Sequence, residues 1–291
     1  MSVFEQNMHL LYGEAGDKWL RSLPGQIDVL SSQWGLRELT PFSDLSYHFV
    51  ARGYQGDEPI VLKLGCDVSV VEQERNALQA FNGYGVATLL EADIKQGALL
   101  ISRAIPGKTL TELFPKDDDK ALEIVCGLAQ KLHQAPIRYS FPRLTQWLAI
   151  LDKEWEIPRM DLQRARALRD TLIRTTKTPV LLHGDLHYSN CLSCDKEWVL
   201  IDPKGVIGDP VFDLSGCLVR EPFLPMMALQ DTSAQVAHRI NLIAKTAQVD
   251  PQRIWDWTFV QTVLSICWSL EDGQTIDKKL EFLGLLRTAM Q

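Results

Sequence analysis

The stretch 180–213 carries the side chains whose types and spacing are best suited to chemistry. Within it, His183, Asp185 and Asn190 follow the pattern H-x-D-x-x-x-x-N, and a short apolar run then ends in the carboxylate of Asp202. This order is typical of the catalytic loop of a kinase followed by an aspartate that binds metal.

Phosphoryl transfer needs few protein groups, because it depends mainly on positioning the reactants and neutralising charge. ATP binds as a magnesium complex, and Mg²⁺ prefers hard oxygen ligands while it keeps several waters. We therefore predict Asp202, a carboxylate, and Asn190, a neutral amide, as the metal ligands. Asp185 lies in the same loop as Asn190 and is predicted to accept the proton of the attacking hydroxyl.

The same pattern also has a purely structural explanation. Asp and Asn are common turn residues, and a strand–turn–strand hairpin would place them between apolar runs without any catalytic role. The strand that ends in Asp202, and a lysine and a glutamate upstream, favour the catalytic interpretation.

Those upstream residues are Lys63, in a strand predicted at 59–64, and Glu74, in a helix predicted at 68–81. An ammonium within an apolar strand is costly unless it finds partners. In a kinase it would contact the α- and β-phosphates and pair with a helix glutamate. The apolar stripe of the helix favours Glu74 over Glu72 as the inward carboxylate. The alternative is that Lys63 and Glu74 are both surface charges.

A loop at 40–46, just before the strand predicted at 46–52, is expected to cover the triphosphate. It contains no glycine, although backbone amides approach phosphates most easily where glycines leave room. Ser43 and Ser46 are therefore the expected donors, and Asp44 would repel phosphate if it pointed inward.

Two more predicted strands, 88–92 and 97–102, lead into an extended hinge at 102–107. An extended hinge leaves backbone groups free for the adenine edge. We expect the carbonyl of Ser102 and the amide of Ala104 to take that role.

The remaining segments read as helices from their apolar periodicity. A helical extension interrupted at Pro24-Gly25 is expected to pack on the sheet. The predicted helices are 1–35, 121–133, 144–156, 161–175, one from about Val211, 234–247, 251–270 and 278–290.

The composition limits the possible functions. A chain of 291 residues with 46% apolar content can bury a core and form two lobes around a cleft. The N-terminal residues show neither the basic region nor the apolar region of a secretory signal, and no run reaches the roughly 18 apolar residues of a membrane span. A cytoplasmic protein without a membrane partner is therefore expected. Its net charge of −7 argues against nucleic acid as a partner and is compatible with a cationic small molecule.

Other motifs favour structural roles. Cys191 and Cys194 form C-x-x-C, but no second pair lies at zinc-ribbon spacing, and the six cysteines are scattered, as in a reducing compartment. We expect His183 to brace the loop backbone. Asp213 is expected to begin a helix and accept backbone amides of the catalytic loop.

Six sequence segments together resemble the aminoglycoside phosphotransferase family, and within it the streptomycin 6-kinase and hydroxyurea phosphotransferase branch. The resemblance covers about 36–285. The segments are HGDLHYSN at 183–190, IDPKG at 201–205, GDPVFDL at 208–214, ERNAL at 74–78, ALLISR at 98–103 and CWSLEDG at 267–273.

The resemblance implies an α+β, bilobal protein-kinase-like fold. Residues 1–103 would form a nucleotide-binding lobe with an antiparallel sheet, one inward helix and the helical extension. Residues 104–291 would form a mostly helical lobe for catalysis and acceptor binding.

The resemblance also implies site roles and cofactors. The cofactors are ATP and Mg²⁺, and the implied site residues are Asp185 as base, Asn190 and Asp202 as magnesium ligands, and Lys63 with Glu74 on the nucleotide side. The chain departs from the family pattern in its glycine-poor loop and at Ser102, where an acidic residue is usual.

Four further residues are candidates, one for catalysis and three for the acceptor pocket. Lys204 lies two residues after the metal aspartate and would stabilise charge on the γ-phosphate, or would instead form an ion pair with Asp185 or Asp209. Trp268, Glu271 and Asp272 would line the acceptor pocket, where carboxylates hold cationic groups. The alternative is that their helix is ordinary packing.

The sequence therefore predicts an ATP-dependent kinase of a small molecule, with a streptomycin-type aminoglycoside as the nominal acceptor. Hydroxyurea or a housekeeping metabolite is the alternative acceptor. A nucleotide-binding pseudokinase is the alternative class, and either a monomer or a homodimer is expected.

Overall fold

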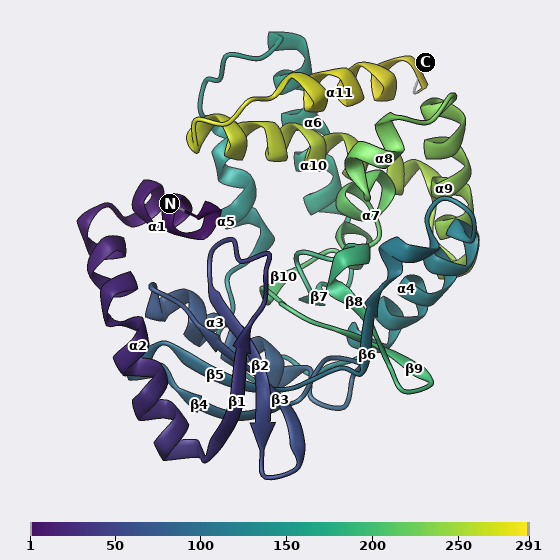
Figure 1. Cartoon of the computed structure of the whole chain (residues 1–291). Coiled ribbons are helices and arrows are strands. Elements are labelled where there is room, and N and C mark those ends of the chain that lie inside the picture. The colour runs from purple at the N-terminus through teal and green to yellow at the C-terminus, as the bar shows by residue number, and fades with distance from the viewer. Residues whose placement is uncertain (1, 290–291) are drawn as a thin grey trace.

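A five-stranded antiparallel sheet, in the order β1-β2-β3-β5-β4, forms the first part of the molecule (Figure 1). A computed structural model describes residues 2–289 of the chain. The strands are β1 (Leu36–Pro41), β2 (Phe49–Gln55), β3 (Glu58–Leu64), β4 (Leu89–Asp93) and β5 (Ala98–Ser102).

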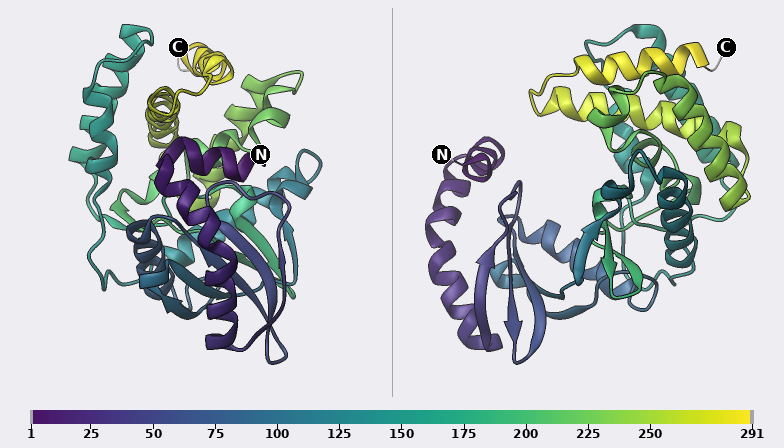
Figure 2. Two further views of the ribbon diagram at one scale, coloured as in Figure 1. Left: turned by 60° about the vertical axis from the view of Figure 1, so that its left-hand side comes forward. Right: turned by 45° about the vertical axis from the view of Figure 1, so that its right-hand side comes forward.

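Strand β3 places its side chains alternately on the two faces of this sheet, because successive residues of a strand point in opposite directions. Leu62 and Leu64 pack in one core with α2 (Glu14–Trp34), which confirms that the helical extension covers the sheet. Lys63, between them, points to the other face, where α3 (Val68–Ala80) lies. Figure 2 shows the sheet between these two helices.

The helical extension is interrupted at a different place from the one predicted. Its first helix, α1 (Val3–Tyr12), ends at Gly13, whose φ of +55° only glycine adopts easily. The predicted interruption at Pro24-Gly25 is wrong, since α2 continues through it. The adjacent Leu23 and, one to two turns on, Leu30 are buried against the sheet, and this packing outweighs the hydrogen bond that proline lacks.

The loop expected to cover the triphosphate joins β1 to β2 rather than preceding the first strand. Its predicted position before the first strand is wrong, because β1 pairs with β2 and β2 begins only at Phe49. Of the six residues of β1 only Leu36 is buried, so this edge strand lacks the alternation that sequence analysis detects. The phosphate loop is the name used below for residues 42–48.

The second part of the described chain is mostly helical, with a three-stranded sheet in the order β6-β8-β9 and a two-stranded sheet of β10 and β7. None of the described helices is long and apolar enough to cross a membrane. The strands are β6 (Pro106–Thr109), β7 (Val180–Leu182), β8 (Cys191–Cys194), β9 (Glu197–Leu200) and β10 (Val206–Gly208). The helices are α4 (Asp118–Leu132), α5 (Leu144–Leu148), α6 (Arg159–Thr175), α7 (Gly216–Arg220), α8 (Phe223–Met227), α9 (Thr232–Ala247), α10 (Pro251–Glu271) and α11 (Asp277–Ala289).

Two predicted helices are shorter than expected. The helix predicted at 144–156 is α5, which tightens into a 3-10 turn at Ala149–Asp152. The helix predicted from about Val211 is a 3-10 turn at Pro210–Phe212, followed by α7. The last residue of the helix predicted at 278–290 lies outside the described residues.

One apolar core joins the inner helix to the second part of the molecule. Ala77 and Leu78 of α3 belong to the same buried cluster as Leu122 of α4 and Leu264 of α10. The division of the chain at residue 103 stays a prediction.

Candidate active site

A buried lysine connects the sheet to Asp202, one of the two predicted metal ligands. The Lys63 ammonium lies 2.8 Å from the Glu74 carboxylate and 3.0 Å from Oδ1 of Asp202. Lys63 and Glu74 are 4% and 6% exposed, so neither is a surface charge. Glu72 instead pairs with Arg75 at the surface. The prediction that Glu74 is the inward carboxylate is confirmed.

The charges of this cluster favour one ionisation state. Burial would lower the pKa of Lys63, but Asp202 and Glu74 outweigh it and raise the pKa above its ordinary value. Removal from bulk water would raise the pKa of Asp202, but Lys63 and then Lys204 hold it well below its ordinary value. Lys63 therefore stays charged, and Asp202 stays a carboxylate.

The hairpin of β8 and β9 brings the two predicted metal ligands together. Cys191 pairs with Leu200, and the pairing continues as the Ile201 amide donates to the carbonyl of Asn190. Asn190 therefore lies opposite the residue that precedes Asp202. Asp202 itself has a φ of +59°, a left-handed conformation that costs a non-glycine residue free energy and is common at functional sites.

The backbone carbonyl of Asp185 contacts Asn190. Asn190 donates its side-chain amide to the carbonyl of Asp185 at 2.9 Å, which leaves the amide oxygen of Asn190 available to a metal. Asp202, bonded to Lys63 through Oδ1, keeps its other oxygen. Within residues 2–289 no cluster of three or more His, Cys, Asp or Glu is suited to a metal. Mg²⁺ in nucleotide sites needs only one or two protein carboxylates beside phosphate oxygens, so this donor set fits it.

Two buried groups brace the catalytic loop. Asp213 accepts the backbone amides of His183 and Gly184 at 2.8 and 2.9 Å, and His133 at 2.9 Å. The His183 ring donates to the carbonyl of Ile201 and accepts the amide of Asp185, which requires a neutral ring. Burial correspondingly lowers the pKa of His183. Both bracing contacts match expectation, although Asp213 follows a 3-10 turn instead of beginning a helix.

Lys204 lies beside the predicted base. Its ammonium is 3.7 Å from the Asp185 carboxylate, so one of the two ion pairs considered for it is present. The other is absent among the described residues, because Asp209 is engaged by Arg253 and by Trp257. The backbone carbonyl of Lys204 accepts the side-chain amide of Gln73 in α3 at 2.7 Å.

A cavity of about 510 Å³ lies between the five-stranded sheet and the hairpin of β8 and β9. The phosphate loop, the segment 101–107 and the hairpin contribute to its lining. The predicted nucleotide residues among its lining are Ser43, Ser46, Lys63, Ser102, Ala104 and Asp202.

The predicted acceptor residues lie outside that lining. Trp268 is 39% exposed at the end of α10, and its ring meets that of Trp147 edge-on at 6.1 Å. Glu271 pairs with Lys153 at 2.8 Å, and the amide of Asp272 caps α10. Trp147 also packs over Gly184, where any added Cβ would meet its ring at 2.8 Å. An aromatic surface thus runs from the catalytic loop to α10.

The C-x-x-C pair is part of the hairpin. Cys191 and Cys194 are free thiols at the two ends of β8, three residues apart, so their side chains point to opposite faces of the strand. No shared metal site results within residues 2–289.

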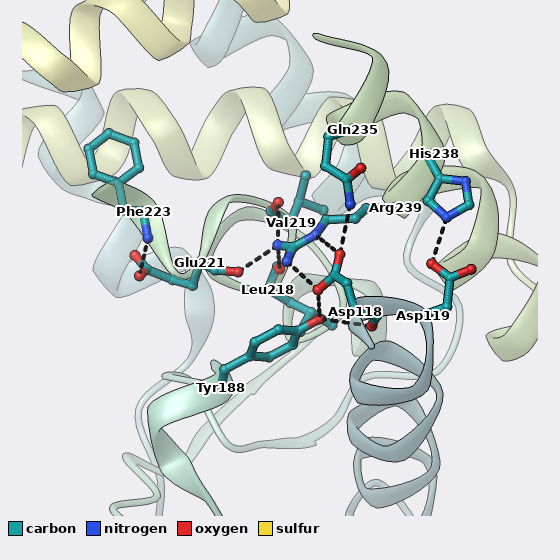
Figure 3. A network of polar contacts seen from close by, with 10 residues as sticks. All are labelled: Asp118, Asp119, Tyr188, Leu218, Val219, Glu221, Phe223, Gln235, His238 and Arg239. Atoms are coloured by element: carbon teal, nitrogen blue, oxygen red, sulfur yellow. Dashed lines mark hydrogen bonds and ion pairs between the residues drawn. The ribbon is translucent and has the colours of Figure 1, made fainter. Parts of the chain in front are cut away.

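A buried network of ion pairs and hydrogen bonds contacts the catalytic loop through Tyr188 (Figure 3). Arg239, which is fully buried, forms a double hydrogen bond to Asp118 at 2.6 and 2.8 Å. The hydroxyl of Tyr188, two residues before Asn190, donates to Asp118 at 2.7 Å.

Several of these residues were not predicted. Gln73, Trp147 and the pair Asp118–Arg239 have no motif spacing, because their partners are far away in the chain. One signal was available. Gln73 directly precedes Glu74 in α3. Because the side chain of Glu74 is predicted to point toward the site, its neighbour Gln73 was a candidate for a contact there.

Comparison with known proteins supports this geometry. The sequence model of the family described as aminoglycoside/hydroxyurea antibiotic resistance kinase matches residues 40–273. A streptomycin 6-kinase of Streptomyces glaucescens is 28% identical, over 90% of this chain and 88% of its own. A hydroxyurea phosphotransferase of Kitasatospora aureofaciens is 30% identical, over 90% of this chain and 77% of its own.

Solved structures establish the fold. An aminoglycoside phosphotransferase in ternary complex with ADP and hygromycin B matches with a TM-score of 0.65 and 14% identity, over 90% of this chain and 96% of that one. A choline kinase from Streptococcus pneumoniae matches with a TM-score of 0.63 and 13% identity, over 90% and 96%. The predicted α+β, protein-kinase-like fold is confirmed.

Proposed function

Because the chain belongs to the aminoglycoside/hydroxyurea antibiotic resistance kinase family, we propose that it transfers the γ-phosphate of ATP to a hydroxyl group of a streptomycin-type aminoglycoside. The contact of the Lys63 ammonium with both Glu74 and Asp202 carries the proposal. It joins the nucleotide side of the site to the metal motif across the cavity.

In this proposal Lys63 binds the α- and β-phosphates, while Ser102 and Ala104 offer backbone groups to the adenine. Ser43 and Ser46 face the phosphates from the loop. Mg²⁺, held by Asp202 and Asn190, would neutralise charge on the transferred phosphoryl group. The role of Asp185 is to orient the acceptor hydroxyl and take its proton, and that of Lys204 is to stabilise charge beside it.

A cationic acceptor fits the acceptor side. Trp268 offers an indole surface, and Glu271 and Asp272 offer carboxylates to ammonium or guanidinium groups. Glu271 already pairs with one ammonium group, that of Lys153, which a cationic acceptor would displace. The net charge of −7 favours the approach of such a molecule.

The test is a panel of acceptors with MgATP, with product identified by mass spectrometry. Streptomycin should be phosphorylated, and Asp185→Asn should lower kcat by about a hundredfold or more while ATP still binds. Asp195→Asn, at the exposed hairpin turn, is the matched control. Phosphorylation of hydroxyurea but not of aminoglycosides would favour the second candidate acceptor, which one relative's activity suggests. ATP binding without turnover of any acceptor would favour a pseudokinase, which the complete set of polar residues argues against.

A further inference from the structure

His48 is the last residue of the phosphate loop and lies directly before β2. It is one of the residues that line the cavity, together with Lys63 and Asp202. Its ring occupies the space beside Gly65, where an added Cβ would meet Cδ2 at 2.9 Å and Nε2 at 3.3 Å. The missing side chain of Gly65 therefore leaves room for the ring.

The ring nitrogens of His48 are available to a ligand. Among residues 2–289 no side chain or backbone group forms a hydrogen bond with either of them, in contrast to His183, whose two nitrogens are both used. Neither is among the fully buried polar atoms that lack a partner. A partly buried ring that lines the cavity and has no partner leaves these nitrogens open to that cavity.

The electrostatic surroundings favour an anion at this place. Burial, reinforced by the nearby Lys63 ammonium, lowers the pKa of His48 to about 3. Lys204 acts in the same direction, and Asp202 opposes it. The ring is therefore neutral at pH 7. It has one N–H to donate, and it carries no positive charge that could form an ion pair with Asp202. A neutral donor beside two ammonium groups suits a phosphate oxygen.

We propose that His48 is a nucleotide-binding residue that donates a ring N–H to the β- or γ-phosphate of ATP. It adds a side-chain donor to a phosphate loop in which no glycine lets the backbone approach the phosphates closely. The inference rests on the proposed function only in taking the cavity as the nucleotide site.

The test compares nucleotides that differ in phosphate number. Binding of AMP, ADP and ATP, each with Mg²⁺, is measured by calorimetry for the wild type, His48→Phe, which keeps a ring without a donor, and His48→Asn, which keeps an N–H donor. His48→Phe should weaken ADP or ATP binding by about tenfold, the contribution of a hydrogen bond to a charged group, and leave AMP unchanged. His48→Asn should recover part of the loss. Equal losses for all three nucleotides, or none, would overturn the assignment.

A measurement on the wild type covers the case in which a variant does not fold. Diethyl pyrocarbonate modifies neutral imidazoles, and peptide mass spectrometry locates the modified histidine. ADP or ATP should protect His48, and AMP should not. No modification in the free protein, or equal protection by AMP, would contradict an open ring at the phosphates. A wild-type protein that binds no adenine nucleotide would count against the proposed function, whereas unchanged binding by the variants overturns only the role of His48.

Discussion

Lys63 has two roles, as a structural counter-ion and as a proposed phosphate ligand. It is the only cation within hydrogen-bonding distance of Glu74 among the described residues, and it also holds Asp202. Burial raises the pKa of Glu74, and Lys63 is the main influence that opposes this rise. Removal of the ammonium would leave a buried carboxylate without a partner.

These two roles can be separated by substitution. Lys63→Met should lower the free energy of unfolding by about 3 kcal/mol, as expected when one member of a buried ion pair is lost, and should also weaken ATP binding. Adding Glu74→Gln should restore much of the stability, measured by urea unfolding, but not the ATP affinity, measured by calorimetry. Lys108→Met removes an exposed lysine and is the control. Recovery of ATP affinity in the double variant would contradict the role of Lys63 at the phosphates.

At the scale of secondary-structure elements, the N-terminal extension bears on the phosphate loop. The side chain of Asn7 in α1 donates to the backbone carbonyl of Ser46 at 3.1 Å. Met8, the next residue, is fully buried, and Leu45 of the loop packs against the same core. In Figure 1, α1 lies beside the end of the β1–β2 hairpin. The N-terminal helix α1, which lies outside the sheet, therefore fixes the position of the phosphate loop through Ser46 and Leu45.

Loss of this contact should affect the nucleotide specifically. Asn7→Ala is expected to raise KM for ATP about two- to fivefold, the worth of one ordinary hydrogen bond, with KM for the acceptor unchanged. Steady-state kinetics with each substrate varied in turn measures both constants. Asn82→Ala, at an exposed position after α3, should change neither. An equal rise in both constants would indicate general damage rather than a displaced loop.

The same elements explain what the sequence could and could not predict. Strand β3 and helix α3 were recognisable because their apolar periodicity is local, and the facing of Lys63 and Glu74 follows from it. The catalytic loop was recognisable from its spacing together with the strand that ends in Asp202 and the upstream Lys63 and Glu74. The hydrogen bond of Asn7 to Ser46 and the position of His48 beside Gly65 were not, because only the fold brings these residues together. The break at Gly13 was missed because proline is the stronger local signal, although packing overrides it.

At the scale of the whole molecule, Arg239 joins segments that are far apart in the chain (Figure 3). It lies in α9, pairs with Asp118 of α4, and donates to the carbonyls of Leu218, Val219 and Glu221 before α8. Its guanidinium also lies 5.2 Å from the ring centre of Tyr188. The planar fork of arginine, with five donors, meets these acceptors in a way that lysine cannot.

Breaking this network should destabilise the fold more than removing it altogether. Arg239→Met leaves Asp118 buried without its cation and should cost about 3–5 kcal/mol in the free energy of unfolding. Adding Asp118→Leu should recover part of that loss, because the charge that lacks a partner is gone. The neighbouring pair His238–Asp119 is half-exposed, so His238→Ala should cost only about 0.5 kcal/mol. Urea unfolding of the wild type and these three variants measures all of these values. A double variant less stable than Arg239→Met would show that Asp118 stabilises the protein through Tyr188 and Gln235 rather than through Arg239.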